Sequence, residues 1–350
     1  MLRRKLDSVK VNLLTWEVAK QKKNEIQLYF NSAALRFKVH YEFKGEKFTE
    51  WFFAKVPIFS NTYDRNLKMG CLENELMMYE NILLHLNRVT DHLFSPVLYY
   101  SCKKDYTLIM SDLTSTGYGA NFNEQFELEE SLRVLQEIAK FHAASVKVLQ
   151  IRADVFDWLN TRFVNEVPLF TQTPDPQFWH ENADRLEDYT THLYNLNTAE
   201  RLSKENPLNV LNHGDYWKTN IMLKYDDRET IESIKFVDFQ ASIVGSPTLD
   251  VFFFIITSVK FDVFEKHGGE LLETYKEIDD RSSFWMFVLV FWMAIVFSSP
   301  EEIAEKTAAY DGLIDGELYA PIADKWMAYF IRRSKEYPER KIFCVPDAIN

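Results

Sequence analysis

The sequence predicts an α+β fold in two lobes: a small sheet-rich lobe over residues 1–110 and a larger, mostly helical lobe over residues 111–350. Two patterns predict this division. Strand-length segments of apolar and alternating residues fill the first part, whereas apolar residues recur at three- and four-residue steps in much of the second. The 350 residues, 47% of them hydrophobic, are sufficient for a core in each lobe.

Three strands are expected near the N-terminus, at residues 26–29, 35–43 and 48–56. Residues 35–43 alternate apolar with polar side chains, as a half-buried strand does. Gly45 lies in the short segment between the second and third strands. These two strands are therefore expected to form a hairpin.

A helix and two further strands complete the predicted N-terminal lobe. Residues 72–86 are expected to be helical, because one face collects apolar side chains at helical spacing: Leu72, Leu76, Tyr79, Leu83 and Leu86. Residues 97–100 and 106–110 have strand character. Residues 111–119, which contain two glycines, then interrupt regular structure.

The C-terminal lobe is expected to consist mainly of helices. The first spans residues 128–149, and others are expected at about 178–204, 246–260, 261–278, 284–298, 300–310 and 317–335. Residues 284–297 form an unbroken apolar run of fourteen residues, whereas a membrane-spanning helix needs about 20. This run and the apolar residues 251–256 are therefore expected in the core, and no membrane span is predicted.

Two short polar motifs, flanked by apolar runs, indicate the chemistry. Leu211–Met222 contains His-x-Asp with an asparagine five residues after the aspartate, and Phe236–Gln240 supplies Asp-Phe eighteen residues beyond that asparagine. Phosphoryl transfer from a nucleotide requires such groups: Asp215 as the base that accepts a hydroxyl proton, and Asn220 and Asp238 as Mg²⁺ ligands beside the triphosphate. The alternative interpretation is a polar loop followed by a strand that ends in a turn.

Lys55 and Glu75 are the expected nucleotide-holding pair. Lys55 lies late in the third predicted strand, and Glu75 lies in the first turn of the following helix. Kinases use a strand lysine to hold the α- and β-phosphates and a helix carboxylate to fix that lysine. Glu73 is the competing carboxylate, but it lies on another face of the helix. Together with the polar motifs, the two lobes predict a bilobal kinase with its hinge near residues 110–113.

Four more polar residues have structural or undecided roles. His213 is expected to pack inward and hydrogen-bond the backbone, and His142 to be a satisfied core histidine. Asp250 begins an apolar helix, and we expect it either to cap that helix or to hold the catalytic loop. Lys218 lies inside the first polar motif. There it either neutralises charge on the transferred phosphoryl group or points to water.

The segment that would cover the phosphates lacks glycine. Residues 27–36 contain none, so no Gly-x-Gly-x-x-Gly motif joins the first two predicted strands. Ser32 and the backbone amides near it are the remaining candidates to bind a phosphate oxygen, although close backbone approach is harder without glycine.

Charge and cysteine content exclude some partners and compartments. The formal net charge of −12 opposes general binding to nucleic acid or to anionic lipid. The three cysteines are far apart in the sequence and show no metal-binding or disulfide pattern. No signal-peptide-like apolar segment follows the N-terminus, so a cytoplasmic location is expected. The oligomeric state is left open.

The two polar motifs, together with others in the same order, resemble those of the ecdysteroid-kinase-like proteins of insects and other invertebrates. This family belongs to the choline-kinase and aminoglycoside-phosphotransferase branch of the protein-kinase-like fold. The resemblance covers about residues 26–300 and rests on Leu108–Leu113, Ile138–Ser145, Glu73–Tyr79, Leu211–Met222, Phe236–Ala241 and Ser246–Asp250. The His-Gly-Asp-x-Trp-x-x-Asn form, with Asp-Phe-Gln in place of Asp-Phe-Gly, is specific to this branch rather than to protein kinases.

The resemblance implies an ATP- and Mg²⁺-dependent kinase that phosphorylates a hydroxyl group of a small molecule. The implied substrates are ecdysteroid hormones or other hydroxylated lipophilic compounds, including xenobiotics. It also implies a role for each candidate residue: Asp215 as the catalytic base, Asn220 and Asp238 as metal ligands, Lys55 with Glu75 as the ATP-holding pair, and Met110 to Asp112 as the hinge beside the adenine.

Two departures from the family pattern leave a second hypothesis open. The family's glycine near the position of Gln27 is missing, and the segment between Tyr275 and Phe284 is shorter than usual. The alternative to an active kinase is therefore a pseudokinase that binds a nucleotide or a small ligand without turnover. A third hypothesis, a protein kinase, is disfavoured because no Ala-Pro-Glu segment follows the Asp-Phe-Gln motif.

Overall fold

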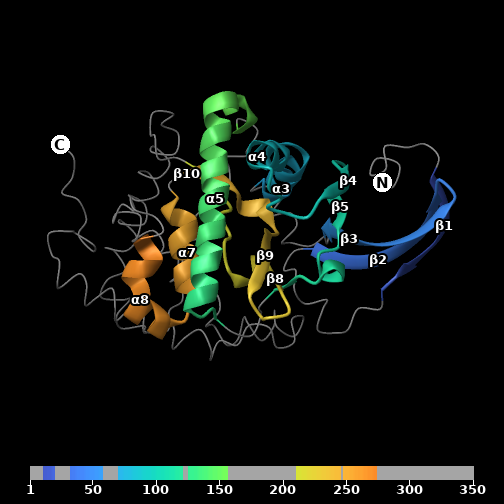
Figure 1. Ribbon diagram of the computed structural model, residues 1–350. Coiled ribbons are helices and arrows are strands. Elements are labelled where there is room, and N and C mark those ends of the chain that lie inside the picture. The colour runs from blue at the N-terminus through green and yellow to red at the C-terminus, as the bar shows by residue number, and fades with distance from the viewer. Residues whose placement is uncertain are drawn as a thin grey trace, which may run out of the picture. The chain divides into compact units, whose positions relative to one another are not determined.

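The structure, a computed structural model, describes residues 11–19, 32–57, 70–120, 125–156, 210–245 and 247–273 (Figure 1). The chain divides into two compact units. Unit 1 contains residues 1–124, 143–163 and 213–243, and unit 2 contains residues 125–142, 164–212 and 244–350. The division into lobes at residue 110 remains a prediction.

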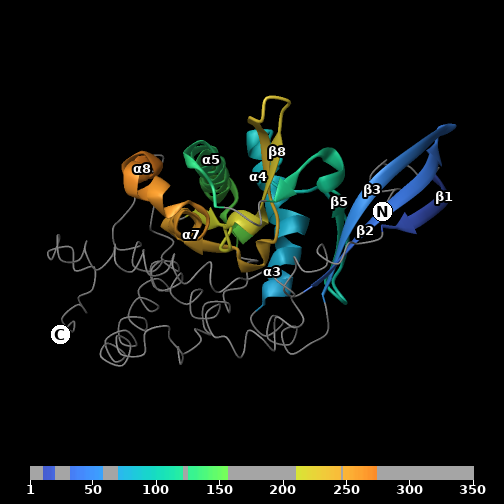
Figure 2. The same cartoon turned by 90° about the horizontal axis from the view of Figure 1, so that it is seen from below.

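A five-stranded antiparallel sheet in unit 1 has the strand order β1-β2-β3-β5-β4. Its strands are β1 (Val11–Val18), β2 (Ser32–Phe43), β3 (Glu46–Pro57), β4 (Leu98–Cys102) and β5 (Thr107–Ser111). Figure 2 shows β1, β2 and β3 side by side as a long curved ribbon. Val39, Tyr41 and Phe52 form the buried cluster on one face of this sheet, so its other face is available to border a site.

The hairpin between β2 and β3 confirms the predicted turn. Lys44 and Gly45 connect the strands, with φ angles of 53° and 82°, and Phe43 pairs with Glu46. A two-residue turn with positive φ at both positions matches the right-handed twist of the strands. The resulting register places Arg36 opposite Phe53.

Strand β1 was not predicted, and the predicted strand at residues 26–29 lies outside the described residues. β1 pairs antiparallel with β2, and its register shifts between Leu13 and Thr15. Most of its side chains are exposed; that of Trp16 is 62% exposed. An edge strand with a bulge and little burial lacks the strict alternation by which strands are recognised in a sequence.

A continuous helical segment follows in unit 1 and confirms the helix predicted at residues 72–86. It consists of α3 (Cys71–Met77), the π-helical turn η2 (Met78–Ile82) and α4 (Leu83–Thr90). In the π turn, the backbone N–H of Leu83 donates to the carbonyl of Met78. Such turns insert one residue into a helix and are frequent at functional sites.

The polar motifs are held by short strands and single turns. In unit 1, β6 (Gly119–Ala120), β8 (Ile221–Tyr225) and β9 (Ile231–Phe236) form a three-stranded sheet. The 3₁₀ turn η6 (Lys218–Asn220) immediately precedes β8, and η7 (Phe239–Ala241) follows β9. The motif residues therefore lie at the ends of one hairpin, next to each other.

Unit 2 is helical around an apolar core. It includes the first part of α5 (Leu128–Arg152), together with α7 (Thr248–Ser258) and α8 (Phe261–Glu273). The two-stranded sheet of β7 (Val210–Asn212) and β10 (Ile243–Gly245) lies mostly in this unit. Residues 251–256 are all buried, as predicted, and Phe126 packs on Phe254 with ring centroids 5.8 Å apart.

The described residues confirm the predicted α+β class, with strands concentrated before residue 112 and the long helices of unit 2 after it. The helices expected near 178–204, 284–298, 300–310 and 317–335, and the apolar run at 284–297, lie outside the described residues. Within the described part of the chain, no helix is long and apolar enough to cross a membrane.

Candidate active site

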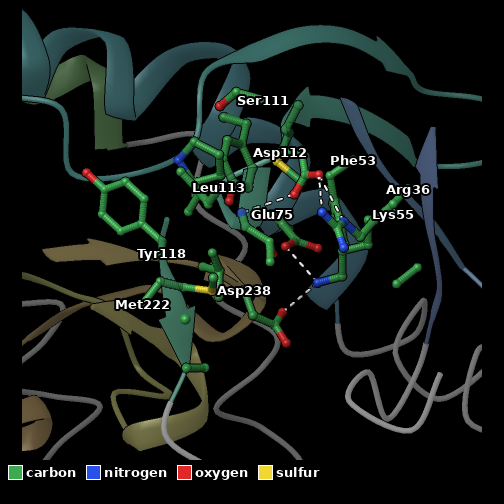
Figure 3. Close-up of a pocket in the computed structure, with 18 residues that line it drawn as sticks. Arg36, Phe53, Lys55, Glu75, Ser111, Asp112, Leu113, Tyr118, Met222 and Asp238 are labelled. Carbon is green, nitrogen blue, oxygen red and sulfur yellow. Dashed lines mark hydrogen bonds and ion pairs between the residues drawn. The ribbon is translucent and has the colours of Figure 1, made fainter. Parts of the chain in front are cut away.

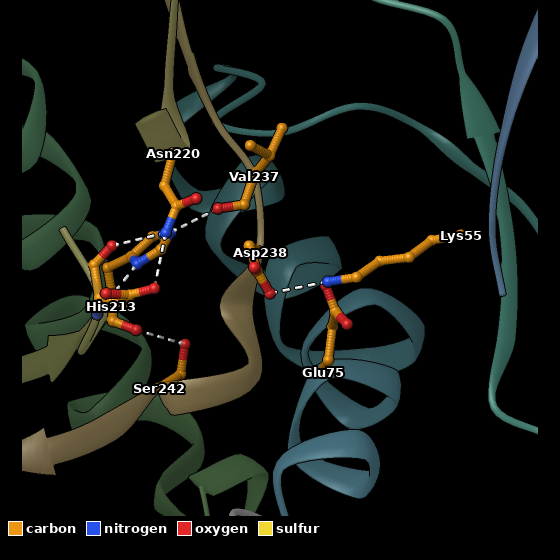
Figure 4. A network of polar contacts seen from close by, with 8 residues as sticks. Lys55, Glu75, His213, Asn220, Val237, Asp238 and Ser242 are labelled. Atoms are coloured by element: carbon orange, nitrogen blue, oxygen red, sulfur yellow. Dashed lines mark hydrogen bonds and ion pairs between the residues drawn. The ribbon is translucent and has the colours of Figure 1, made fainter. Parts of the chain in front are cut away.

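Lys55 joins two carboxylates in unit 1. Its Nζ lies 2.7 Å from Glu75 Oε1 and 2.7 Å from Asp238 Oδ1 (Figure 4). Lys55 and Glu75 are buried, whereas the Asp238 side chain is 20% exposed. Glu73 is exposed, so the structure selects Glu75 over its competitor. The lysine thus connects β3 and α3 with the residue that precedes η7.

Burial and charge oppose each other at this lysine. Burial favours neutral Lys55, but the charges of Asp238 and Glu75 prevail and raise the pKa of Lys55. Burial, together with the charge of Asp238, raises the pKa of Glu75 against the opposing effect of Lys55. One ammonium group therefore faces two carboxylates, and the site has a surplus of negative charge that suits a cation.

Asp215 and Asn220 are bound to each other in the loop before β8. Asn220 Nδ2 donates to Asp215 Oδ2 at 2.8 Å and to the Asp215 carbonyl at 2.9 Å. The Val237 N–H donates to the Asn220 carbonyl at 3.0 Å. These bonds place the asparagine between the candidate base and the residue that precedes Asp238.

The carboxyl group of Asp215 has a strongly shifted pKa. Burial and the nearby charge of Asp238 raise it from 3.8 to about 7, although the hydrogen bond from Asn220 lowers it. Asn220 bonds both Asp215 and Val237, the residue before Asp238, so the two carboxyl groups belong to one site. A carboxylate with a pKa near neutrality can accept a proton in a catalytic step.

His213 is fully buried, as predicted, and it connects the two polar motifs. Its Nε2 lies 2.9 Å from the Val237 carbonyl, and its Nδ1 accepts from the Asp215 N–H at 3.3 Å. Since a carbonyl only accepts hydrogen bonds, these partners place the proton on Nε2. The Ser242 hydroxyl donates to the His213 carbonyl at 3.2 Å. The imidazole is thus a structural connector between the motifs.

Gly214 was not singled out in the sequence, but the site depends on it. Its φ is +83°, and a Cβ at this position would lie 1.9 Å from the Ala241 carbonyl oxygen. The backbone of the first motif therefore touches the backbone of η7 directly. The glycine was visible inside the His-x-Asp motif, but the contact with Ala241 arises only in the folded chain.

A cavity of about 270 Å³ in unit 1 adjoins the charged cluster (Figure 3). Its lining includes Lys55, Glu75, Met110, Asp112 and Asp238, and so brings five predicted residues together. Other members come from β2, β3, β8, the end of β5 and the segment after it: Ala34, Arg36, Phe53, Ser111, Leu113, Thr114, Tyr118 and Met222. Ser32 begins β2, but its side chain lies outside the described residues.

The other three predicted polar roles, those of Lys218, His142 and Asp250, can also be compared with the structure. Lys218 is 1% exposed, so the alternative in which it points to water is wrong. His142 is satisfied in the core, as predicted, because its Nε2 lies 3.0 Å from Asp250 Oδ2. Asp250 lies in the first turn of α7 rather than at its N-cap, which is Pro247 and makes no side-chain cap. The capping alternative for Asp250 is therefore wrong.

The oxygen groups near the cavity fit a magnesium ion. The Asn220 amide uses its Nδ2 toward Asp215, which leaves its oxygen as a ligand, and one Asp238 oxygen contacts Lys55. Within the described residues, no group of three or more His, Cys, Asp or Glu could hold a metal. Mg²⁺ is usually held by only one or two protein carboxylates together with phosphate oxygens and water, so this donor set suits a metal that arrives with a nucleotide.

Comparison with protein families gives a match over most of the chain. The model described as "Ecdysteroid kinase-like family" matches residues 29–278. No curated protein sequence matches this chain.

Several solved structures are similar over nearly the full length. A spectinomycin phosphotransferase in complex with ADP and spectinomycin shares 11% identity and a TM-score of 0.47, covering 90% of this chain and 93% of that chain. A choline/ethanolamine kinase family protein from Mesorhizobium loti shares 13% identity and a TM-score of 0.43, covering 94% and 91%. The choline kinase LicA from Streptococcus pneumoniae shares 11% identity and a TM-score of 0.43, covering 94% and 98%.

Proposed function

Because the chain belongs to the ecdysteroid kinase-like family, we propose that it transfers the terminal phosphoryl group of ATP to a hydroxyl group of a small molecule. The observation that carries this proposal is the meeting of two groups of residues. Lys55 holds Glu75 and Asp238, while Asn220 holds Asp215 and accepts from the N–H of Val237, the residue before Asp238. A base, a cation and metal-binding oxygens are the parts that phosphoryl transfer requires.

Each part has a place in the proposed reaction. The nucleotide occupies the cavity, with its base beside Met110 and its phosphates at Lys55, which Glu75 keeps oriented. The oxygen of the substrate hydroxyl attacks the terminal phosphorus of ATP, and Asp215 accepts the hydroxyl proton. The bond between that phosphorus and the bridging oxygen of the β-phosphate breaks, and ADP leaves with this oxygen. Mg²⁺, held by Asn220 and Asp238, would neutralise charge on the phosphates when bound.

We propose a hydroxylated lipophilic compound as the acceptor, either an ecdysteroid or a xenobiotic alcohol. The family description supports this class, and the net charge of −12 disfavours nucleic acid as a partner. The proposal also includes a cytoplasmic location and a nucleotide-binding lobe over residues 1–110.

The direct test is incubation of the purified chain with ATP, Mg²⁺ and a panel of ecdysteroids and other alcohols, with phosphate esters detected by mass spectrometry. The wild type should form an ester, and Asp215→Asn should lower kcat by about 10²–10⁴-fold. Ester formation at an unchanged rate in the variant would exclude Asp215 as the base.

The second candidate function is nucleotide or ligand binding without turnover. The absence of glycine from residues 27–36 favours it, because backbone amides approach phosphates less closely there. Under this alternative the wild type would bind ATP with Mg²⁺ in a thermal-shift assay and yet phosphorylate no acceptor. Phosphorylation of a single alcohol in the panel would exclude it.

A further inference from the structure

Arg36 and Asp112 form an ion pair inside the lining of the cavity. Arg36 Nε and Nη2 lie 2.9 and 2.8 Å from Asp112 Oδ2 (Figure 3). The side chain of Asp112 is 1% exposed, and that of Arg36 is 25% exposed. The pair joins β2 to the residue that follows β5, across 76 positions of sequence. Arg36 and Asp112 both lie outside the two polar motifs, so those motifs did not predict this contact.

The remaining acceptors of Asp112 are occupied by its own chain segment. Its Oδ1 accepts from the Thr114 N–H at 3.1 Å, and its carbonyl accepts from the Ser115 hydroxyl at 2.7 Å. The carboxylate therefore shapes residues 111–115 into a fixed turn at the edge of the cavity. With both oxygens engaged, Asp112 acts on a bound nucleotide through the shape of this segment.

The other end of the pair is held by the sheet. The guanidinium carbon of Arg36 lies 5.5 Å from the centroid of the Trp51 ring, a cation–π arrangement. Arg36 pairs in register with Phe53, and both line the cavity. The arginine is thus fixed by β3 before it reaches Asp112, so the ion pair sets the distance between β2 and residues 111–115.

The pair also controls the charge inside the cavity. An arginine alone there would attract phosphate groups and compete with Lys55 for them. Because Asp112 neutralises Arg36, Lys55 is left to bind the phosphates, while the part of the cavity near Met110 suits the uncharged base.

We propose that Arg36 and Asp112 are positioning residues for the nucleotide: their ion pair fixes the edge of the cavity that borders the base. The inference rests on the proposed function, since it assumes that ATP occupies this cavity. Loss of either partner should weaken nucleotide binding, while the chemical step at Asp215 is retained once ATP is saturating.

The test is a double-mutant cycle read by calorimetric ADP binding and by steady-state kinetics. Arg36→Gln and Asp112→Asn should each weaken ADP affinity about tenfold or more. The double variant should be no weaker than either single variant, because the broken pair is lost only once. KM for ATP should rise in proportion, and kcat should stay within about twofold.

Two further variants separate positioning from loss of folding. Arg36→Lys keeps the charge but loses the planar fork, so it should show an intermediate affinity. Arg152→Gln is the matched control, because it removes an exposed arginine–aspartate pair, Arg152 with Asp154, that lies outside the cavity lining. This control should leave ADP affinity unchanged.

The possible results are distinct. Weakening by Arg36→Gln with no effect of Asp112→Asn would show direct contact with the nucleotide and overturn positioning. If the wild type binds ADP and neither variant weakens that binding, the inference is overturned but the proposed function is not. A wild-type chain that binds neither ADP nor ATP would overturn the inference together with the proposed function.

Discussion

Tyr79 packs edge-on against Phe239, with the two ring centroids 5.6 Å apart and the ring planes at 90°. Tyr79 lies in the π turn, four residues after the lysine partner Glu75, and Phe239 follows Asp238. One helical segment therefore supports both Glu75, which contacts Lys55, and Phe239, which follows Asp238. Edge-to-face aromatic pairs of this kind are worth about 0.5–1.5 kcal/mol beyond the area they bury.

Replacement of Tyr79 should lower kcat by more than the loss of stability alone explains. Tyr79→Ala should lower the free energy of unfolding by about 3–5 kcal/mol and lower kcat, because Phe239 loses its support and Asp238 is held less firmly. Tyr79→Phe keeps the ring and should retain most of the free energy of unfolding and most of kcat. Denaturant unfolding and steady-state kinetics at a temperature where each variant is folded measure the two effects.

A control for this experiment is Tyr41→Ala. Tyr41 is 1% exposed and stacks on Phe48 in the sheet, and it is not part of the cavity lining. This variant should lose comparable stability but keep its kcat. An equal loss of kcat in the two alanine variants would mean that Tyr79 acts through general stability alone.

The pH dependence of activity should follow Asp215. Its pKa of about 7 means that the base form increases as pH rises from 6 to 8. Below pH 7, kcat/KM should therefore rise about tenfold per pH unit, then level off. Asp215→Asn should remove this rise. Bound Mg²⁺ should move the midpoint in kcat to lower pH than in kcat/KM, since a cation favours the carboxylate. A pH-independent kcat/KM over this range would contradict the assignment.

The same group makes stability depend on pH with a definite sign. The native pKa of about 7 exceeds the ordinary value of 3.8, so protons bind the native state more tightly. The stabilisation is complete below about pH 4 and is lost as pH rises through 7. In thermal unfolding without nucleotide, Asp215→Asn should raise Tm at pH 8 and do so much less at pH 5. A gain that is equal at both pH values would not fit a titrating carboxyl group.

Gly214 should tolerate no side chain, and Gly45 provides a matched comparison. Both have φ near +82°, but a Cβ on Gly45 would meet no atom within 4 Å. Gly45→Ala should therefore cost only the left-handed strain, about 1–2 kcal/mol. Gly214→Ala adds the clash with Ala241 and should cost about 1–3 kcal/mol more, with loss of activity. Urea denaturation compares the two, and equal costs would show that the backbone contact at Ala241 relaxes freely.

In unit 2, the His142–Asp250 pair should stabilise the core rather than take part in catalysis. The side chains are 3% and 1% exposed, so His142→Ala would leave Asp250 buried without this partner, at about 3–5 kcal/mol. His142→Leu combined with Asp250→Leu should cost less than the sum of the single replacements, because no charge then remains buried. Additive costs in urea denaturation would show that the two residues act independently.

Features set by neighbouring residues were predictable from the sequence. The hairpin turn at Lys44–Gly45 and the choice of Glu75 over Glu73 follow from turn chemistry and helix periodicity, and the structure agrees with both. The π turn was not predicted. The apolar residues from Leu72 to Leu86 are spaced as in an ordinary α-helix, so the sequence gives no sign of the inserted residue. Strand β1 was missed for a related reason: its bulge removes the alternation.

Contacts between distant segments were not predictable in the same way. Arg36 carries no motif, and its pairing with Asp112 depends on the order of strands in the sheet. The close approach of Gly214 to Ala241 depends likewise on the hairpin between them. Such pairs require the folded chain, since nothing local to either residue specifies the other.

The backbone of Asp238 affects how any mutational study of this site should be interpreted. Its φ and ψ of 66° and 64° lie in the left-handed region, which asparagine and aspartate tolerate better than other side chains with a Cβ. An alanine there changes the local backbone geometry and removes the carboxylate at the same time, so an inactive alanine variant is ambiguous. Asparagine keeps the conformational preference and one oxygen, which makes it the cleaner probe of the carboxylate charge.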